Sequence, residues 1–164
     1  MNTAVISDNK TLMKTIISDF KQLTKVGLSL SVVFSSVAGY LLAVETVHYA
    51  TLFLLALGGF FMVGASNAFN QIIEIDTDAI MKRTQNRPLP TGRMSVNVAL
   101  STAVLFTILG IAILYSINPK SALFGAISIF LYTCVYTPLK AVTPLTVFVG
   151  AIPGAIPFML GWFA

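Results

Sequence analysis

The sequence predicts an all-α, polytopic membrane helix bundle. Of its 164 residues, 56% are hydrophobic and only 10% are charged, whereas a soluble domain carries about 25% charged residues. Five apolar runs are each close to the roughly 20 residues that cross a bilayer as a helix. None of these runs alternates in polarity as the strands of a membrane barrel do. The expected solvent for most of the chain is therefore lipid.

Residues 1–25 are predicted to form a cytoplasmic amphipathic segment ahead of the first span. Between residues 11 and 25, apolar side chains fall on one face at the helical period and lysines fall on the other. The apolar set is Leu12, Ile16, Ile17, Phe20 and Leu23, and the basic set is Lys14, Lys21 and Lys25. This pattern is typical of a helix that lies on a membrane surface.

Residues 26–164 are predicted to form a transmembrane domain. Its spans are Val26–Val44, Thr51–Ile73, Val96–Tyr115, Ala122–Pro138 and Leu145–Phe163, of which the fourth is the shortest. A polar loop, roughly residues 78–95, joins the second span to the third. Pro88, Pro90 and Gly92 prevent this loop from forming one continuous helix. Long loops inside compact proteins are often functional.

The basic residues predict how the chain is oriented. Nine of the ten Lys and Arg residues fall in segments on one side of the predicted spans, and only Lys120 falls on the other. Basic residues mark the cytoplasmic side of membrane proteins. The prediction is a multi-pass protein of the cell inner (plasma) membrane, with its N-terminus and its acidic motif facing the cytoplasm.

Composition also excludes several kinds of site. The net charge of +4 follows from this orientation bias, so it does not indicate nucleic-acid binding. Cys134 is the only cysteine, which excludes a disulfide framework and a thiolate metal cluster. We expect it to be a small buried side chain.

Half of the six acidic residues lie within five positions, at the end of the second apolar run. Asn70, Glu74 and Asp78 are four residues apart, and each step of four in a helix advances about 40° around the axis and about 6 Å along it. These three side chains therefore form one stripe. Asp76 lies about 200° from Glu74 and is predicted to point elsewhere.

The stripe is predicted to bind Mg²⁺. Two carboxylates close to lipid repel each other and are costly to desolvate, and a hard divalent cation with oxygen ligands removes both problems. The basic residues that follow would neutralise a diphosphate, with arginine binding it bidentately; they are Lys82, Arg83, Arg87 and Arg93. The alternative is that these groups form salt bridges among themselves and cap the helix, although acidic groups at a helix C-terminus oppose its dipole.

Tyr136 and Lys140 form a second polar pair, four residues apart in YTPLK at the inner end of the fourth span. Both could face the same pocket as the stripe, and they are predicted to contact the diphosphate there. The alternative is an aromatic residue of the membrane interface beside a lysine that extends to the headgroups.

These motifs resemble those of a known family. The run NQIIEIDTDAIMKRTQNRPLPTGRMS is similar to the first acidic motif and following loop of the UbiA superfamily of intramembrane prenyltransferases. YTPLK matches a YxxxK element of that superfamily, and GAIPGAIPFMLGW resembles its next helix. The resemblance implies a UbiA-like fold of about nine transmembrane helices, of which about five are present here, around a cavity open to lipid.

The resemblance also implies a reaction. It places Asn70, Glu74 and Asp78 as catalytic Mg²⁺ ligands, with Glu74 where many members have aspartate. Within the loop, MKRTQNRPLPTGR is most similar to members that transfer a farnesyl group from farnesyl diphosphate to a vinyl side chain of heme b, giving heme O. His48 is predicted on the opposite side of the membrane, so heme is expected as a substrate.

Two other interpretations stay open. One is a UbiA-type prenyltransferase that acts on an aromatic quinone precursor, because the acidic motif would serve both acceptors. The other is an inactive truncated fragment, because the superfamily carries a second aspartate-rich motif and no Asp or Glu follows Asp78 here. We expect the chain to be the N-terminal part of such an enzyme.

Overall fold

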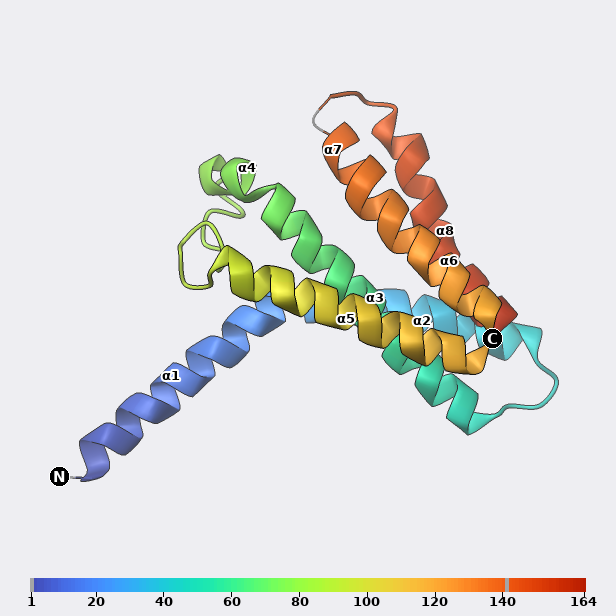
Figure 1. Cartoon of the computed structure of the whole chain (residues 1–164), viewed down its shortest axis with the longest axis horizontal. Coiled ribbons are helices and arrows are strands. Elements are labelled where there is room, and N and C mark those ends of the chain that lie inside the picture. Colours follow the sequence, from blue (N-terminus) through green and yellow to red (C-terminus); the bar gives the residue numbers. More distant parts are fainter. Residues whose placement is uncertain (1, 141) are drawn as a thin grey trace.

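The five predicted spans are five long helices in the computed structural model (Figure 1). The structure describes residues 2–140 and 142–164, with side chains from residue 12 onward; Met1, the Lys10 side chain and Ala141, which the predictions included, lie outside these residues. All five helices are long and apolar enough to cross a membrane: α2 (Val26–Ala43), α3 (Tyr49–Ile73), α5 (Val96–Ile117), the continuous stretch Pro119–Leu139, and α8 (Thr146–Phe163). No strand occurs among the described residues. The all-α prediction is confirmed.

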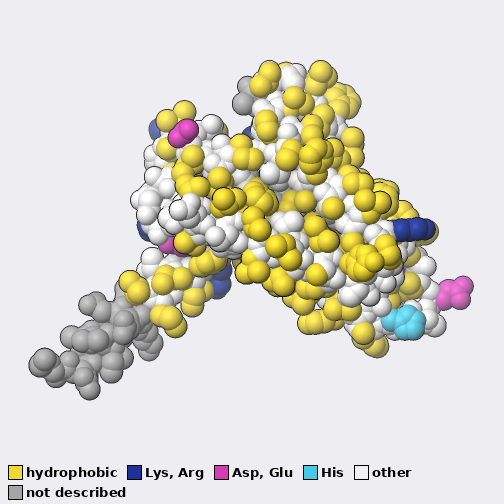
Figure 2. Space-filling view, in the orientation of Figure 1, with side chains coloured by type: hydrophobic (Ala, Val, Ile, Leu, Met, Phe, Trp, Pro, Cys, Tyr) yellow, Lys and Arg dark blue, Asp and Glu magenta, His cyan; other side chains and the backbone are white. Residues whose placement is uncertain are grey.

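The outside of the bundle is apolar. Figure 2 shows hydrophobic side chains over most of the visible face, with charged side chains gathered toward the ends. Phe34 and Leu42 of α2 are each 72% exposed, and Phe148 of α8 is 76% exposed. Side chains of this size are normally buried in a water-soluble protein. Their exposure fits a multi-pass membrane protein whose helices are covered by lipid.

α1 (Asn2–Leu23) extends away from the side of the bundle (Figure 1). Leu12, Ile16 and Ile17 are exposed, whereas Leu23 at the end of the helix is fully buried. The chain then turns sharply at Lys25, whose φ of 45° is in the left-handed region. Lys25 therefore lies beyond α1, and the prediction that it continues the polar face of this helix is wrong.

Two amide side chains of α3 hold the turn between α1 and α2. The Gln71 amide nitrogen donates to the carbonyl oxygens of Gln22 (3.0 Å) and Leu23 (2.8 Å). The Asn67 amide nitrogen donates to the Thr24 carbonyl oxygen (3.3 Å). Both amide residues are buried, so these bonds are shielded from water and fix where α1 leaves the bundle.

Replacing Gln71 by leucine is expected to loosen this turn. The side chain keeps its size but loses both donors, which should lower the free energy of local opening by about 1–2 kcal/mol. Hydrogen exchange would measure this as faster exchange at the end of α1 in Gln71→Leu than in Gln85→Leu, a matched change in an exposed loop residue. Equal protection in the two variants would show that Gln71 does not hold α1.

The helices pack in pairs, with α3 along α5 and α2 along α8. Two glycines bring the backbones of α2 and α8 close together. A Cβ atom added at Gly39 would collide with the Phe158 carbonyl oxygen, and one added at Gly161 would collide with the Ser36 carbonyl oxygen. Small residues allow this kind of close approach between membrane helices. Gly39 and Gly161 therefore set how closely α2 and α8 approach each other.

The fourth span is not one regular α-helix. α6 (Pro119–Phe130) widens into a π-helix, η1 (Leu131–Tyr136), and ends in α7 (Thr137–Leu139). Pro138 has no N–H, and its ring collides with the carbonyl group four residues earlier in an α-helix. We attribute the wider turn to this proline. The turn leaves Cys134 exposed, so the expectation of a buried cysteine is wrong.

Candidate functional site

A polar cluster lies at the end of α3 and in α4 (Ile75–Ile80). α3 stops at Ile73, and Glu74 has φ −96° and ψ 12°, which breaks the helix. Hydrogen bonds nevertheless run from the Glu74 N–H to the Asn70 carbonyl (3.0 Å) and from the Asp78 N–H to the Glu74 carbonyl (2.7 Å). The spacing of four residues therefore persists through the break. Asn70 and Asp78 are both buried and Asp76 is exposed.

Each member of the stripe has a partner from another part of the chain. The Thr137 hydroxyl donates to Asn70 Oδ1 (3.1 Å). Lys140 Nζ lies 2.6 Å from Glu74 Oε1, and an Arg87 guanidinium nitrogen lies 2.5 Å from Asp78 Oδ2. The end of α3, with α4 and the polar loop that follows it, thus meets the end of the fourth span, which is distant in sequence.

The predicted basic residues do not all reach the stripe. Arg87 and Lys140 pair with it directly, as described. Arg93 instead pairs with Asp19 of α1 (3.1 Å) and donates to the Asn86 carbonyl (3.0 Å). Lys82 and Arg83 are exposed, and neither forms a salt bridge among the described side chains. Arg93 therefore links α1 to the polar loop. Lys82 and Arg83 lie at the surface.

Tyr136 and Lys140 have different surroundings. Lys140 contacts the stripe through Glu74, whereas the Tyr136 ring stacks on Tyr132 with 5.0 Å between ring centroids. The same ring lies against Gly150 of α8, where a Cβ atom would come within 2.6 Å of it. Tyr136 therefore packs between the fourth span and α8.

Lys25 also belongs to the surroundings of the polar cluster, although the sequence pattern does not predict it as a site residue. It is half-buried, and burial lowers the pKa of its ammonium below the ordinary value of 10.5, with Arg87 lowering it further. Glu74 and Asp78 raise this pKa, and Lys140 lowers it. These influences place Lys25 in the electrostatic field of the polar cluster. Its position directly before the first apolar run was the only signal in the sequence.

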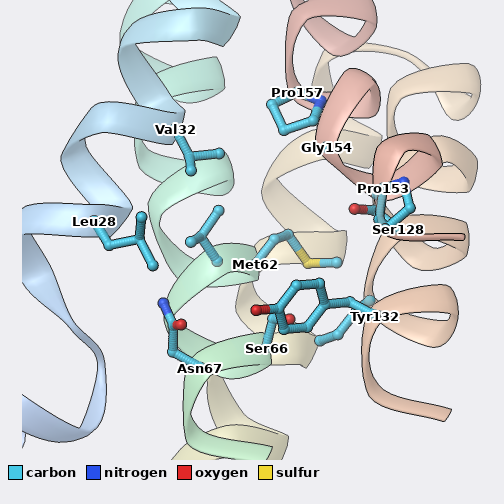
Figure 3. Close-up of a pocket in the computed structure, with 14 residues that line it drawn as sticks. Leu28, Val32, Met62, Ser66, Asn67, Ser128, Tyr132, Pro153, Gly154 and Pro157 are labelled. Carbon is cyan, nitrogen blue, oxygen red and sulfur yellow. The ribbon is translucent and has the colours of Figure 1, made fainter. Parts of the chain in front are cut away.

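An apolar cavity of about 210 Å³ lies next to this cluster, between α2, α3, the fourth span and α8 (Figure 3). Leu28, Val32 and Met62 line it, and Figure 3 shows Tyr132 extending from η1 toward Ser66 and Met62. Asn67 also lines the cavity, one helical turn before Asn70. An apolar cavity beside paired charges suits a molecule with an apolar tail and an anionic head.

The donor atoms of the stripe fit Mg²⁺ in type. The described residues contain no group of three or more His, Cys, Asp or Glu side chains that could hold a metal. Mg²⁺ does not need such a group, because it often binds one or two carboxylates and completes its shell with water and substrate phosphate. Glu74, Asp78 and the amide oxygen of Asn70 supply that kind of partial ligand set.

Comparison with known proteins agrees with this description. Residues 32–164 match the model of the UbiA prenyltransferase family. A Flavobacterium psychrophilum protein named protoheme IX farnesyltransferase is 65% identical over 155 residues, covering 93% of this chain and 52% of that protein. The human protein named mitochondrial protoheme IX farnesyltransferase is 40% identical to this chain over 144 residues, covering 87% of this chain and 32% of the human protein.

Solved structures show the same fold. A UbiA homolog from Archaeoglobus fulgidus, bound to DMAPP and Mg²⁺, has a TM-score of 0.80 and 21% identity, covering 88% of this chain and 53% of that one. A digeranylgeranylglyceryl phosphate synthase has a TM-score of 0.82 and 22% identity, covering 88% of this chain and 52% of that one. The chain spans about half the length of the curated relatives it matches. It belongs to the UbiA prenyltransferase family.

Proposed function

We propose that the chain carries the donor site of an enzyme that transfers a farnesyl group from farnesyl diphosphate to a vinyl side chain of heme b, giving heme O. We choose heme b as the acceptor because this chain is 62–67% identical to three bacterial proteins named protoheme IX farnesyltransferase. The pairing of an apolar cavity with a polar cluster supports a prenyl diphosphate as donor.

In this proposal the cavity holds part of the farnesyl chain and the cluster holds the diphosphate. Asn70, Glu74 and Asp78 would bind Mg²⁺, which supplies positive charge to the diphosphate when it is bound. The bound Mg²⁺ would balance the negative charge of Glu74 and Asp78. Lys140 and Arg87, which pair with these carboxylates, could then contact the diphosphate. Both cations lie close enough to the stripe to donate to diphosphate oxygens, Arg87 in bidentate fashion.

The other residues predicted for the site have smaller proposed roles in substrate binding. Tyr136 would close the polar end of the cavity over the reacting carbon. Lys82, Arg83 and Arg93 were predicted to bind diphosphate; since they lie apart from the stripe, we propose that they contribute mainly through long-range attraction of the anionic donor.

The reaction breaks the bond between farnesyl C1 and its diphosphate oxygen, and the electron pair leaves with the diphosphate. The vinyl π electrons of heme form the new carbon–carbon bond to C1. Water then adds to the carbocation left beside the porphyrin ring and loses a proton, which gives a hydroxyethylfarnesyl substituent. The basic groups of the cluster would stabilise the developing charge of the leaving diphosphate.

We further infer the orientation from charge. Nine of the ten basic residues fall in segments that the sequence predicts on the side of the polar cluster. By the positive-inside bias we infer that the N-terminus and the cluster face the cytoplasm from the cell inner (plasma) membrane. The bilayer would then deliver the apolar tail of the donor directly to the cavity.

A chimeric enzyme tests the proposed function. Residues 1–164 would replace the matching half of the Flavobacterium psychrophilum relative, and membranes containing the chimera would receive heme b, farnesyl diphosphate and Mg²⁺. We expect mass spectrometry to detect heme O, and we expect chelation by EDTA to abolish its formation until Mg²⁺ is restored.

The relative itself serves as the positive control, and the 164-residue chain alone shows whether this half suffices. A chimera that inserts into membranes but forms no heme O would contradict the proposal. Prenylation of 4-hydroxybenzoate without heme O would favour the aromatic acceptor instead.

A further inference from the structure

A separate cleft of about 520 Å³, lined by charged and polar residues, lies beside the polar cluster at the junction of α1 and α2. Its lining includes Lys21 of α1, Lys25 of the turn and Arg87 of the polar loop, and no acidic residue lines it. Leu28 lines both this cleft and the apolar cavity. The cleft is therefore a cationic recess that adjoins the cavity.

Lys25 is held in this cleft by a strained backbone. It is the only residue other than glycine with a positive φ among those described, a conformation that is unfavourable for a side chain with a Cβ atom. The Ser29 hydroxyl and the Asn67 amide both donate to the Thr24 carbonyl (2.8 and 3.3 Å), and Gln71 donates to the Leu23 carbonyl (2.8 Å). Such strain persists where surrounding bonds enforce it, and it is concentrated at functional sites.

The local charges leave Lys25 without a counter-ion. Glu74 and Asp78 pair with Lys140 and Arg87, and none of the salt bridges among the described side chains involves Lys25. Three cations thus face two carboxylates in this region. The lowered pKa of Lys25, caused first by burial and then by Arg87, agrees with an ammonium group that lacks an anion.

We propose that Lys25, together with Lys21 and Arg87, forms a binding site for an oxyanion of a substrate. The oxyanion is a phosphate group of the donor or a propionate carboxylate of the heme acceptor, since both match ammonium and guanidinium donors. The left-handed turn at Lys25 places this residue in the lining of the cleft, three residues before Leu28, which also lines the cavity. This inference rests on the proposed function, because it assumes a substrate with an anionic group.

Binding measurements with the purified chain in lipid nanodiscs test the site. Lys25→Gly removes the ammonium group while keeping the turn, because glycine adopts this φ without strain, and Lys25→Asn is a second variant that tolerates it. The ligands are inorganic diphosphate with Mg²⁺, measured by calorimetry, and heme b beside its dimethyl ester, measured by absorption. The ester lacks the carboxylates and so isolates their contribution.

We expect both variants to bind one of the two anionic ligands about tenfold more weakly or worse, because a hydrogen bond to a charged group is lost. Weaker diphosphate binding identifies the donor as the source of the oxyanion. Heme binding that falls to the level of the ester identifies the acceptor. Lys25→Arg should retain most of the affinity, and Lys120→Gln, at an exposed lysine in the first turn of α6, should change nothing.

Unchanged binding of both ligands in Lys25→Gly and Lys25→Asn would overturn the inference and leave the proposed function standing. A wild-type chain that binds neither ligand would overturn the proposed function, and this inference with it. Lys25→Gly is expected to keep or slightly raise Tm in either case, because glycine relieves the strain at this φ, so a loss of affinity would not reflect unfolding.

Discussion

Replacing Asp78 by asparagine is expected to lower kcat/KM for farnesyl transfer by about a hundredfold or more. The side chain is buried and lies 2.5 Å from Arg87, and in the proposed site its charge holds Mg²⁺. Asparagine keeps the shape and one oxygen but not the charge. The measurement is the initial rate of heme O formation by the chimera over a range of farnesyl diphosphate concentrations.

Asp76→Asn is the matched control for this experiment. It makes the same chemical change two residues away on α4, where the side chain is exposed, and we expect a change in rate of less than about twofold. Loss of a buried ion-pair partner also destabilises a protein, so membrane insertion and Tm of Asp78→Asn must be recorded. A well-inserted Asp78→Asn chimera with the activity of Asp76→Asn would show that the stripe is structural.

Replacing Gly161 by alanine is expected to be the most damaging small change in the bundle. The added methyl group would collide with the Ser36 carbonyl oxygen and the Tyr40 nitrogen, which are backbone atoms of α2. A helix backbone cannot move aside as a flexible side chain can, so α8 must shift. Overpacking of this kind costs about 1–3 kcal/mol, which should lower Tm by about 2–12 °C in a chain of this size.

Gly154→Ala is the matched control in the same helix. A Cβ atom at Gly154 would meet no atom within 4 Å, and alanine favours a helix by up to about 1 kcal/mol over glycine. Thermal unfolding in detergent should therefore give an unchanged or slightly raised Tm for this variant. Equal Tm values for the two variants would contradict the close approach of α2 and α8.

The spans and the stripe could be predicted because each depends on local pattern. Apolar length sets where a membrane helix can lie, and the helical period places Asn70, Glu74 and Asp78 on one side whether or not the axis bends at Glu74. The pairing of Glu74 with Lys140 could also be predicted, because both side chains were expected to face one pocket. What could not be predicted was which loop cation meets which carboxylate.

Those choices depend on contacts between distant segments. Arg93 was predicted to bind the diphosphate, but the path of α1 brings Asp19 to it. Lys25 was expected on the polar face of a helix, but the amides of Asn67 and Gln71 draw the turn toward α3. Pro138 widened the fourth span and turned Cys134 outward, an effect that the apolar length of that span does not reveal.

The most direct test of the central claim is whether the polar cluster binds a prenyl diphosphate through a metal. Calorimetric titration of the chain in nanodiscs with farnesyl diphosphate should give binding in Mg²⁺ that weakens about tenfold or more in EDTA. Asp78→Asn should lose this metal dependence, and Asp76→Asn should keep it. Affinity that is the same with and without Mg²⁺, and the same in both variants, would contradict the assignment of Asn70, Glu74 and Asp78 as the metal–diphosphate site.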